Sequence, residues 1–232
     1  MSESQTPQER SVRVWDPWVR ISHWLVAAGF LAAYLSAEEV MALHVWAGYL
    51  VATLVLLRVA WGFVGARHAR FADFVPSPAR LAAYVRDIGR GRERRYLGHN
   101  PLGGVMALAL LLALASTATT GMMTLGAEEQ AGPLGGFYAA QGAGAGLTPI
   151  AAARADEDEE VEAYHEAGEE EEGEEGAGEA LEEVHELSAN LTLGLVVLHV
   201  LGVAWTSWRE RQNLARAMVD GRKRPVDEGG GS

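Results

Sequence analysis

Four long stretches without a charged side chain constrain the fold of this chain more than any other feature. They hold 17, 18, 32 and 22 residues and cover 21–37, 40–57, 96–127 and 187–208. The hydrocarbon core of a bilayer is about 30 Å thick, and roughly 20 mostly apolar helical residues are needed to cross it. A core helix of a soluble protein would show a polar face, whereas residues 105–125 contain nothing more polar than Ser and Thr. The sequence therefore predicts four membrane-spanning helices.

The placement of Lys and Arg predicts the orientation of these helices. Of the 19 basic residues, three precede the first span, nine lie in 58–98 and six follow residue 208, which leaves only Arg154. Basic residues concentrate on the cytoplasmic side of a membrane protein. We therefore expect an all-α transmembrane four-helix bundle with both termini in the cytoplasm.

The formal net charge of −12 arises from one segment. Residues 126–186 hold 19 Asp and Glu against one Arg, in a Gly-, Ala- and Glu-rich composition that cannot bury a core. We expect a long, acidic, low-complexity extracytoplasmic loop that is largely disordered. The expected organisation is spans one to three in 1–125 with a cytoplasmic segment at 65–98, the loop at 126–184, span four at 185–208 and a cytoplasmic tail at 209–232.

Composition also excludes several classes of function. A chain with excess acid is not expected to bind nucleic acid, because phosphate backbones are bound by surplus Lys and Arg. The absence of cysteine excludes disulfides, thiolate nucleophiles and iron–sulfur clusters.

Four histidines lie within or at the ends of the predicted spans, where a ligating side chain is costly and indicates function. His23 lies near the cytoplasmic end of span one, and His44 lies near the opposite end of span two. Span four carries His185 at its extracytoplasmic mouth and His199 deeper in the membrane. The 14 residues between these two correspond to ~21 Å and ~40° of rotation, so both side chains project from one helix face. Depth then pairs His44 with His185 and His23 with His199.

Two imidazoles that face each other across a bundle suit a haem iron with both axial positions filled. Zinc would need three or four converging ligands, and no span interior carries an acid. Gly48 and Gly202 follow His44 and His199 closely and would let a flat macrocycle approach the backbone. A divalent-metal transporter with a Glu-rich collecting loop, and a structural subunit with incidental histidines, are the alternatives from other classes.

Three features near the cytoplasmic surface add expectations. Arg58 is 14 residues after His44 on the same helix face, and it either pairs with a haem propionate or extends to the lipid headgroups. A short interfacial helix is expected to begin at Ser77 or Pro78 and to end at Gly89. Asn100 is expected to cap the third span, and His99 beside it is either a helix-start residue or a contact to a quinone headgroup or propionate.

Five segments carry a resemblance to a known family. They are RVWDPWVRISHW (13–24), LRVAWGFVG (57–65), YLGHNPLGG (96–104), HELSANL (185–191) and RAMVDGRKR (216–224). They resemble the bacterial cytochrome b561 family, which includes the b-type cytochrome subunits of nickel–iron hydrogenases, and only the acidic loop lies outside the resemblance. The resemblance implies two haem b groups, with His23, His44, His185 and His199 as the axial ligands of the haem irons.

The resemblance also implies a function. We expect a multi-pass protein of the bacterial inner membrane that carries electrons between an extracytoplasmic redox partner and the quinone pool. The partner would be a cytochrome c, a dehydrogenase or a hydrogenase, so the chain would be an electron-transfer subunit, surrounded by lipid, in a homo- or hetero-oligomer. The alternative within the family is a stand-alone superoxide-to-quinone oxidoreductase, which the acidic loop disfavours because it repels an anion.

Overall fold

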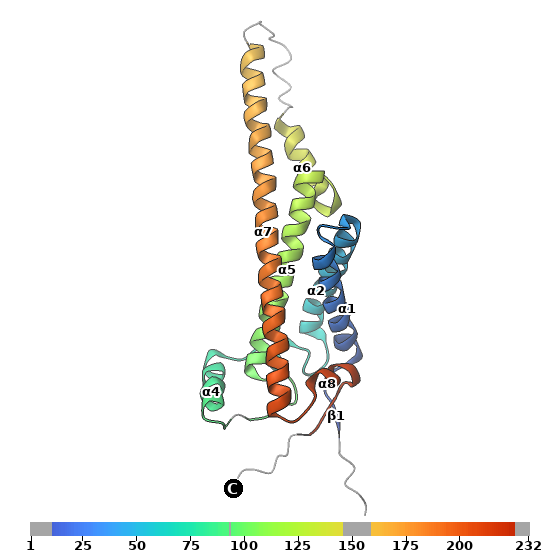
Figure 1. The fold of residues 1–232 in the computed structure, drawn as a ribbon, viewed down its shortest axis with the longest axis vertical. Helices are drawn as coiled ribbons and strands as arrows, with labels where there is room; N and C mark the ends of the chain where they lie inside the picture. Colours follow the sequence, from blue (N-terminus) through green and yellow to red (C-terminus); the bar gives the residue numbers. More distant parts are fainter. Residues whose placement is uncertain (1–10, 93, 146–158, 226–232) are drawn as a thin grey trace, which may run out of the picture. The chain divides into compact units, whose positions relative to one another are not determined.

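The computed structural model describes residues 11–92, 94–145 and 159–225 (Figure 1). In chain order its elements are β1 (Val12–Arg13), α1 (Pro17–Ser36), α2 (Met41–Val64), α3 (Phe71–Phe74), α4 (Pro78–Gly89), α5 (Pro101–Glu129), α6 (Gly132–Ala145), α7 (Glu159–Arg209), α8 (Leu214–Asp220) and β2 (Arg222–Lys223). Four helices are long and apolar enough to cross a membrane, namely α1, α2, α5 and the Gly178–Arg209 part of α7. The expected all-helical chain with four candidate spans is thereby confirmed.

The chain divides into two compact units, which are described separately. Met1–Ala115 and Thr192–Ser232 form the first unit, and Ser116–Leu191 forms the second. All four spans contribute to one apolar core in the first unit. Its buried members are Phe30 of α1, Val51 and Val55 of α2, and Leu114 of α5, and Leu193 and Val196 of α7 pack against them.

α1 and α2 run side by side and form the closest helix pair of this core (Figure 1). Gly29 of α1 makes the close approach possible, since a Cβ atom there would lie 3.0 Å from Val51 of α2. Small residues at such contacts let two helix backbones approach and increase van der Waals packing within a membrane.

Two helices begin at the caps that the sequence predicts. The side chain of Asn100 accepts a hydrogen bond from the backbone N–H of Gly103 at 2.7 Å, and Pro101 is the first residue of α5. α4 begins in the same way, because Ser77 accepts a hydrogen bond from the N–H of Arg80 ahead of Pro78. These caps supply acceptors for backbone donors that have no partner within the helix.

The two ends of the first unit are joined by a small β-ladder that the sequence did not indicate. Val12 pairs with Lys223 and Arg13 with Arg222 in antiparallel register. Gly221 ends α8 with a φ of 77°, and its carbonyl accepts hydrogen bonds from the N–H groups of Val14 and Trp15 at 2.8 and 3.3 Å. The tail expected from residue 209 thus contains α8 and β2, while residues 226–232 lie outside the described residues.

The acidic segment differs from the expected largely disordered loop. α5 continues to Glu129, α6 follows, and α7 is a single helix of 51 residues that begins at Glu159. Ala and Glu are strong helix formers, and extending an existing helix costs less than nucleating a new one. Span four is therefore the C-terminal part of a longer helix and does not begin at residue 185. Residues 146–158 of the expected loop lie outside the described residues.

In the second unit the chain reverses between α5 and α6. Gln130 and Gly132 adopt φ values of 50° and 70°, which is the left-handed region that a tight reversal requires. A Cβ atom on Gly126 of α5 would lie 2.8 Å from the ring of Tyr138 of α6. The ring of Tyr138 therefore packs directly on the backbone of α5, which compensates for the poor helix propensity of a Gly-rich segment.

Candidate functional site

His23 of α1 and His199 of α7 face each other within the first unit. Their ring centroids lie 6.2 Å apart, and the ring planes make an angle of 66°. His23 also contacts Trp24, with ring centroids 5.4 Å apart. These two side chains were paired by depth from the sequence, and the structure brings them together.

The separation of the two rings fits a metal between them. A metal–imidazole nitrogen bond is about 2.0 Å long, so two imidazoles on opposite sides of one iron have ring centroids roughly 6 Å apart. Among the described residues no group of three or more His, Cys, Asp or Glu side chains is placed to hold a metal ion. The chemistry of this site is therefore that of two nitrogen ligands, which suits a haem iron better than zinc.

The imidazole rings of His44 and His185 are each held by a hydrogen bond from Nδ1 to a backbone carbonyl, His44 in the first unit and His185 in the second. In the first unit the Nδ1 of His44 donates to the carbonyl of Ala33 at 2.9 Å. In the second unit the Nδ1 of His185 donates to the carbonyl of Thr117 at 3.0 Å and lies 3.1 Å from the hydroxyl of Thr120. A bond from Nδ1 to a carbonyl fixes the tautomer whose Nε2 carries the lone pair, as in histidines that bind metals. Their pairing with each other stays a prediction.

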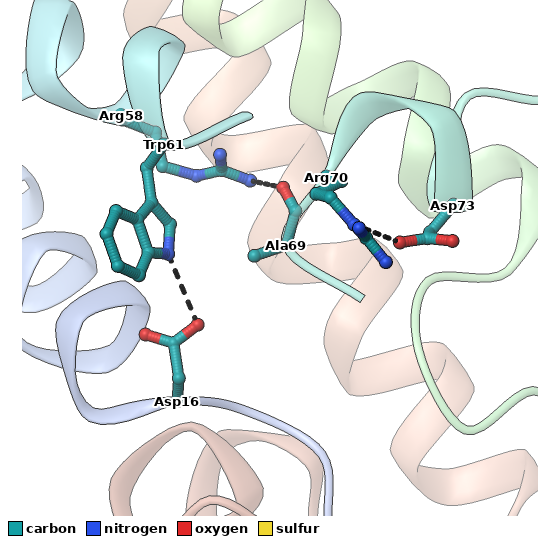
Figure 2. A network of polar contacts seen from close by, with 6 residues as sticks. All are labelled: Asp16, Arg58, Trp61, Ala69, Arg70 and Asp73. Carbon is teal, nitrogen blue, oxygen red and sulfur yellow. Dashed lines mark hydrogen bonds and ion pairs between the residues drawn. The ribbon is translucent and has the colours of Figure 1, made fainter. Parts of the chain in front are cut away.

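Arg58 lies near the end of α2, and only some of its guanidinium N–H donors have a hydrogen-bond partner among the described residues. Its Nη2 donates to the carbonyl of Ala69 at 3.1 Å (Figure 2), and its guanidinium lies 5.9 and 5.8 Å from the ring centroids of Phe71 and Phe74. Its Nη1 is buried and has no hydrogen-bond partner among the described residues. The aromatic rings thus hold the side chain in place while one donor points at no acceptor.

Two more side chains of the first unit have a buried donor without a hydrogen-bond partner among the described residues. The Nε1 of Trp18 and the Nε of Arg20 have no acceptor in the described part of the chain, where no buried side-chain oxygen is left without a donor. Buried polar groups are nearly always hydrogen-bonded. An excess of donors therefore fits a ligand that brings acceptors, and the two propionate carboxylates of a haem are such acceptors.

The glycines that follow two of the histidines leave room for such a ligand. A Cβ atom on Gly48 or on Gly202 would meet no described atom within 4 Å. Open space on the helix surface beside His44 and His199 is what a flat macrocycle against the backbone requires. The same open space lies beside Gly194, so the role of Gly48 and Gly202 stays a prediction.

Asp16 joins the beginning of α1 to the end of α2. One oxygen of its carboxylate accepts the N–H of Val19 at 2.9 Å and caps α1, and the other lies 3.4 Å from the indole nitrogen of Trp61 (Figure 2). A single side chain thus fixes both where α1 begins and how it meets α2. His23 lies about two turns after this cap on the same helix.

His99 lies in an aromatic enclosure just before α5. The rings of Trp15 and Phe74 each have their centroids 4.8 Å from that of His99. Burial, and then the positive charge of Lys223, lower the pKa of His99 to about 3. The ring is therefore neutral at physiological pH, and its Nδ1 has no hydrogen-bond partner among the described residues.

Lys223 is a residue of this region that the sequence did not single out. It is 8% exposed, its Nζ donates to the carbonyl of Gly98 at 3.1 Å, and it lies 5.4 Å from the ring centroid of Trp15. Burial lowers the pKa of Lys223. A basic tail normally indicates solvated side chains, so only the pairing of β1 with β2 reveals that this one is buried.

Comparison with known proteins shows the family of the chain. The family model described as "Prokaryotic cytochrome b561" matches residues 14–221. The chain belongs to the prokaryotic cytochrome b561 family. The family is one of b-type cytochromes, so haem b is the cofactor that membership implies, and the four candidate spans fit a multi-pass membrane protein.

This cytochrome b561 family member is also similar in sequence to a named bacterial relative. The chain is 32% identical over 142 residues to a protein of Rhizobium leguminosarum bv. viciae named "Probable Ni/Fe-hydrogenase B-type cytochrome subunit". The match covers 49% of this chain and 59% of the length of that relative. No solved structure matches the chain.

Replacing Asp16 with Ala should destabilise this cytochrome. Loss of a helix N-cap costs about 1 kcal/mol, and the hydrogen bond to Trp61 is lost with it. We expect a lower thermal midpoint for Asp16→Ala in detergent, followed by circular dichroism. Asp73→Ala is the matched control, because it removes only an exposed ion pair with Arg70 (3.1 Å; Figure 2) and should change the midpoint little. An equal or larger loss in the control would contradict this role of Asp16.

Proposed function

We propose that the chain is a di-haem cytochrome in which His23 and His199 are the axial ligands of one haem iron, and His44 and His185 those of a second. The 6.2 Å separation of the His23 and His199 rings is the observation that carries the first assignment. The second rests on the predicted depths of His44 and His185 and on their Nδ1–carbonyl bonds. When bound, haem supplies one-electron chemistry at its iron.

The protein side chains have distinct roles in this proposal. The four histidines fix the positions of the two cofactors, and the carbonyls of Ala33 and Thr117 orient His44 and His185. Arg58 offers its buried Nη1 to a propionate, while Phe71 and Phe74 hold its guanidinium. The apolar core of the first unit excludes water from the space between the helices.

The proposed reaction is electron transfer across the bacterial inner membrane, between an extracytoplasmic redox partner and the quinone pool. Both termini and the Arg-rich segment 65–98 would face the cytoplasm, because basic residues are retained there. The name of the Rhizobium relative supports a hydrogenase as one partner, and the Glu-rich segment would favour a basic partner such as a cytochrome c. The chain would thus act as an electron-transfer subunit within an oligomer.

Single replacements of the histidines test the ligand pairs. We expect His23→Ala and His199→Ala each to remove the same haem, because both ligands serve one iron, and His44→Ala to remove the other. The measurement is the reduced-minus-oxidised visible spectrum with haem content per protein. His68→Ala is the matched control, because His68 lies between α2 and α3 and is not one of the four candidate ligands, so this variant should retain both haems.

Two outcomes would contradict the proposal. Wild-type protein without a b-type α band would exclude a haem protein altogether. Loss of different haems in His23→Ala and His199→Ala, with both proteins still folded, would show that these residues do not share an iron.

Replacing Arg58 with Gln tests the propionate contact. Reduction adds one negative charge to a haem, so a nearby cation stabilises the reduced state and raises the midpoint potential. We expect Arg58→Gln to retain haem and to lower one midpoint potential by roughly 30–60 mV, which is about a threefold to tenfold change for one electron. Redox titration measures it, and the exposed Arg67→Gln is the control. An unchanged or raised potential in Arg58→Gln would remove Arg58 from the site.

A further inference from the structure

A cavity of about 340 Å³ lies beside the ends of two spans, and none of the four candidate haem ligands lines it. Its walls come from the segment after α2, from the beginning of α4 and from the loop before α5, including His68, Pro76, Arg80 and Tyr96. α2 ends at Val64 and α5 begins at Pro101, so the cavity lies where the chain leaves the membrane. Lipid headgroups occupy that depth.

The lining of the cavity has an apolar part and a cationic part. Phe74, Pro76, Leu97 and Pro101 supply the apolar part, and Arg80 and Arg95 supply the positive charge. His68 and the neutral ring of His99 complete the wall. Asp73 is the carboxylate in the lining, and it is paired with Arg70 at 3.1 Å. The local balance of charge is therefore positive.

Arg80 is the cation whose charge is not compensated. Arg95 lies 3.9 Å from Glu210 and donates to Gln212 at 3.0 Å. The guanidinium of Arg80, by contrast, makes no ion pair or hydrogen bond to any described residue. A guanidinium presents a planar fork of donors that matches two oxygens of a phosphate. A quinone offers only neutral carbonyl oxygens, so its binding would leave the positive charge of Arg80 uncompensated.

α4 places the cavity at a lipid surface. Tyr84 is the buried residue of this helix and contacts Tyr96 in the cavity wall, with ring centroids 5.7 Å apart. Val85 is 50% exposed, and the helix leads into the arginine-rich run 90–95. An amphipathic helix with exposed apolar and basic residues lies in the interface of a membrane and is attracted to anionic lipid.

We propose that this cavity binds the phosphate of an anionic membrane phospholipid, with Arg80 as its principal partner and Arg95 and His68 beside it. The apolar lining accommodates the glycerol region, and the acyl chains continue into the bilayer next to α5. The bound lipid joins α4 to the beginning of the third span. None of the four proposed axial histidines lines this site, although Phe74, which contacts Arg58, is part of its wall.

Native mass spectrometry of the full haem-loaded protein in mild detergent tests the proposal. Phosphatidylglycerol and phosphatidylcholine with identical acyl chains are added separately, and the visible spectrum of each sample is recorded. We expect one phosphatidylglycerol to be retained under activation that removes phosphatidylcholine. Arg80→Gln should weaken this binding roughly tenfold or more, since hydrogen bonds to a charged group are lost, and Arg80→Lys should give an intermediate loss. Both variants should keep the wild-type spectrum, because Arg80 is exposed and does not support the fold.

Arg86→Gln is the matched control, because this arginine is on the same helix, is exposed and is outside the cavity lining. Four outcomes would overturn the proposal: equal retention of both lipids, equal loss in Arg86→Gln, binding of inorganic phosphate in place of the lipid, or displacement of the lipid by a short-chain quinone. Loss of the haem spectrum in Arg80→Gln would also overturn it, because the cavity would then serve the cofactor.

Discussion

A hydrocarbon environment offers no hydrogen-bond partner to a peptide group, and the rest of this structure depends on that constraint. Backbone donors and acceptors must be satisfied within each spanning segment, so the spans are helices. Side chains that remain polar inside them are costly. Phe30, Val51, Val55 and Leu114 form the apolar core that the constraint favours. Placing the polar rings of His23 and His199 next to each other among these helices is therefore costly. Binding of a metal between the two rings, as we propose, would offset that cost.

The site is built from connections between residues that are distant in the sequence. Asp16 caps α1, the helix that carries His23, and contacts Trp61 of α2. The β-ladder places the Nζ of Lys223 5.4 Å from the ring centroid of Trp15. The ring of Trp15 in turn contacts His99. The two ends of the chain therefore close the same end of the first unit. The buried Nη1 of Arg58 has no hydrogen-bond partner among the described residues.

The four candidate spans and the approximate depth of each histidine could be predicted, because both depend on the order of residues along the chain. A span must be uncharged over its length, and depth in a membrane follows from position in a helix, which is why His23 and His199 could be paired. The β1–β2 ladder could not be predicted, since strands of two residues show no alternation. A helix continuous with span four could be expected for Glu179 to Glu186. The earlier beginning of α7 could not, because Glu- and Gly-rich composition indicates only that a segment cannot form a core, whereas the extension of a helix depends on the span that follows it. His44 and His185 were singled out by the same argument from depth, and their pairing stays a prediction.

The electron paramagnetic resonance spectrum of the oxidised, purified protein tests the central claim most directly. Two imidazole ligands hold ferric haem in the low-spin state, and ring planes far from parallel, such as the 66° between His23 and His199, make that signal strongly anisotropic. We expect low-spin signals to account for all of the bound haem, with at least one of strongly anisotropic form. A dominant high-spin signal would show that an axial position is not filled by histidine, and would contradict the pairing across the bundle.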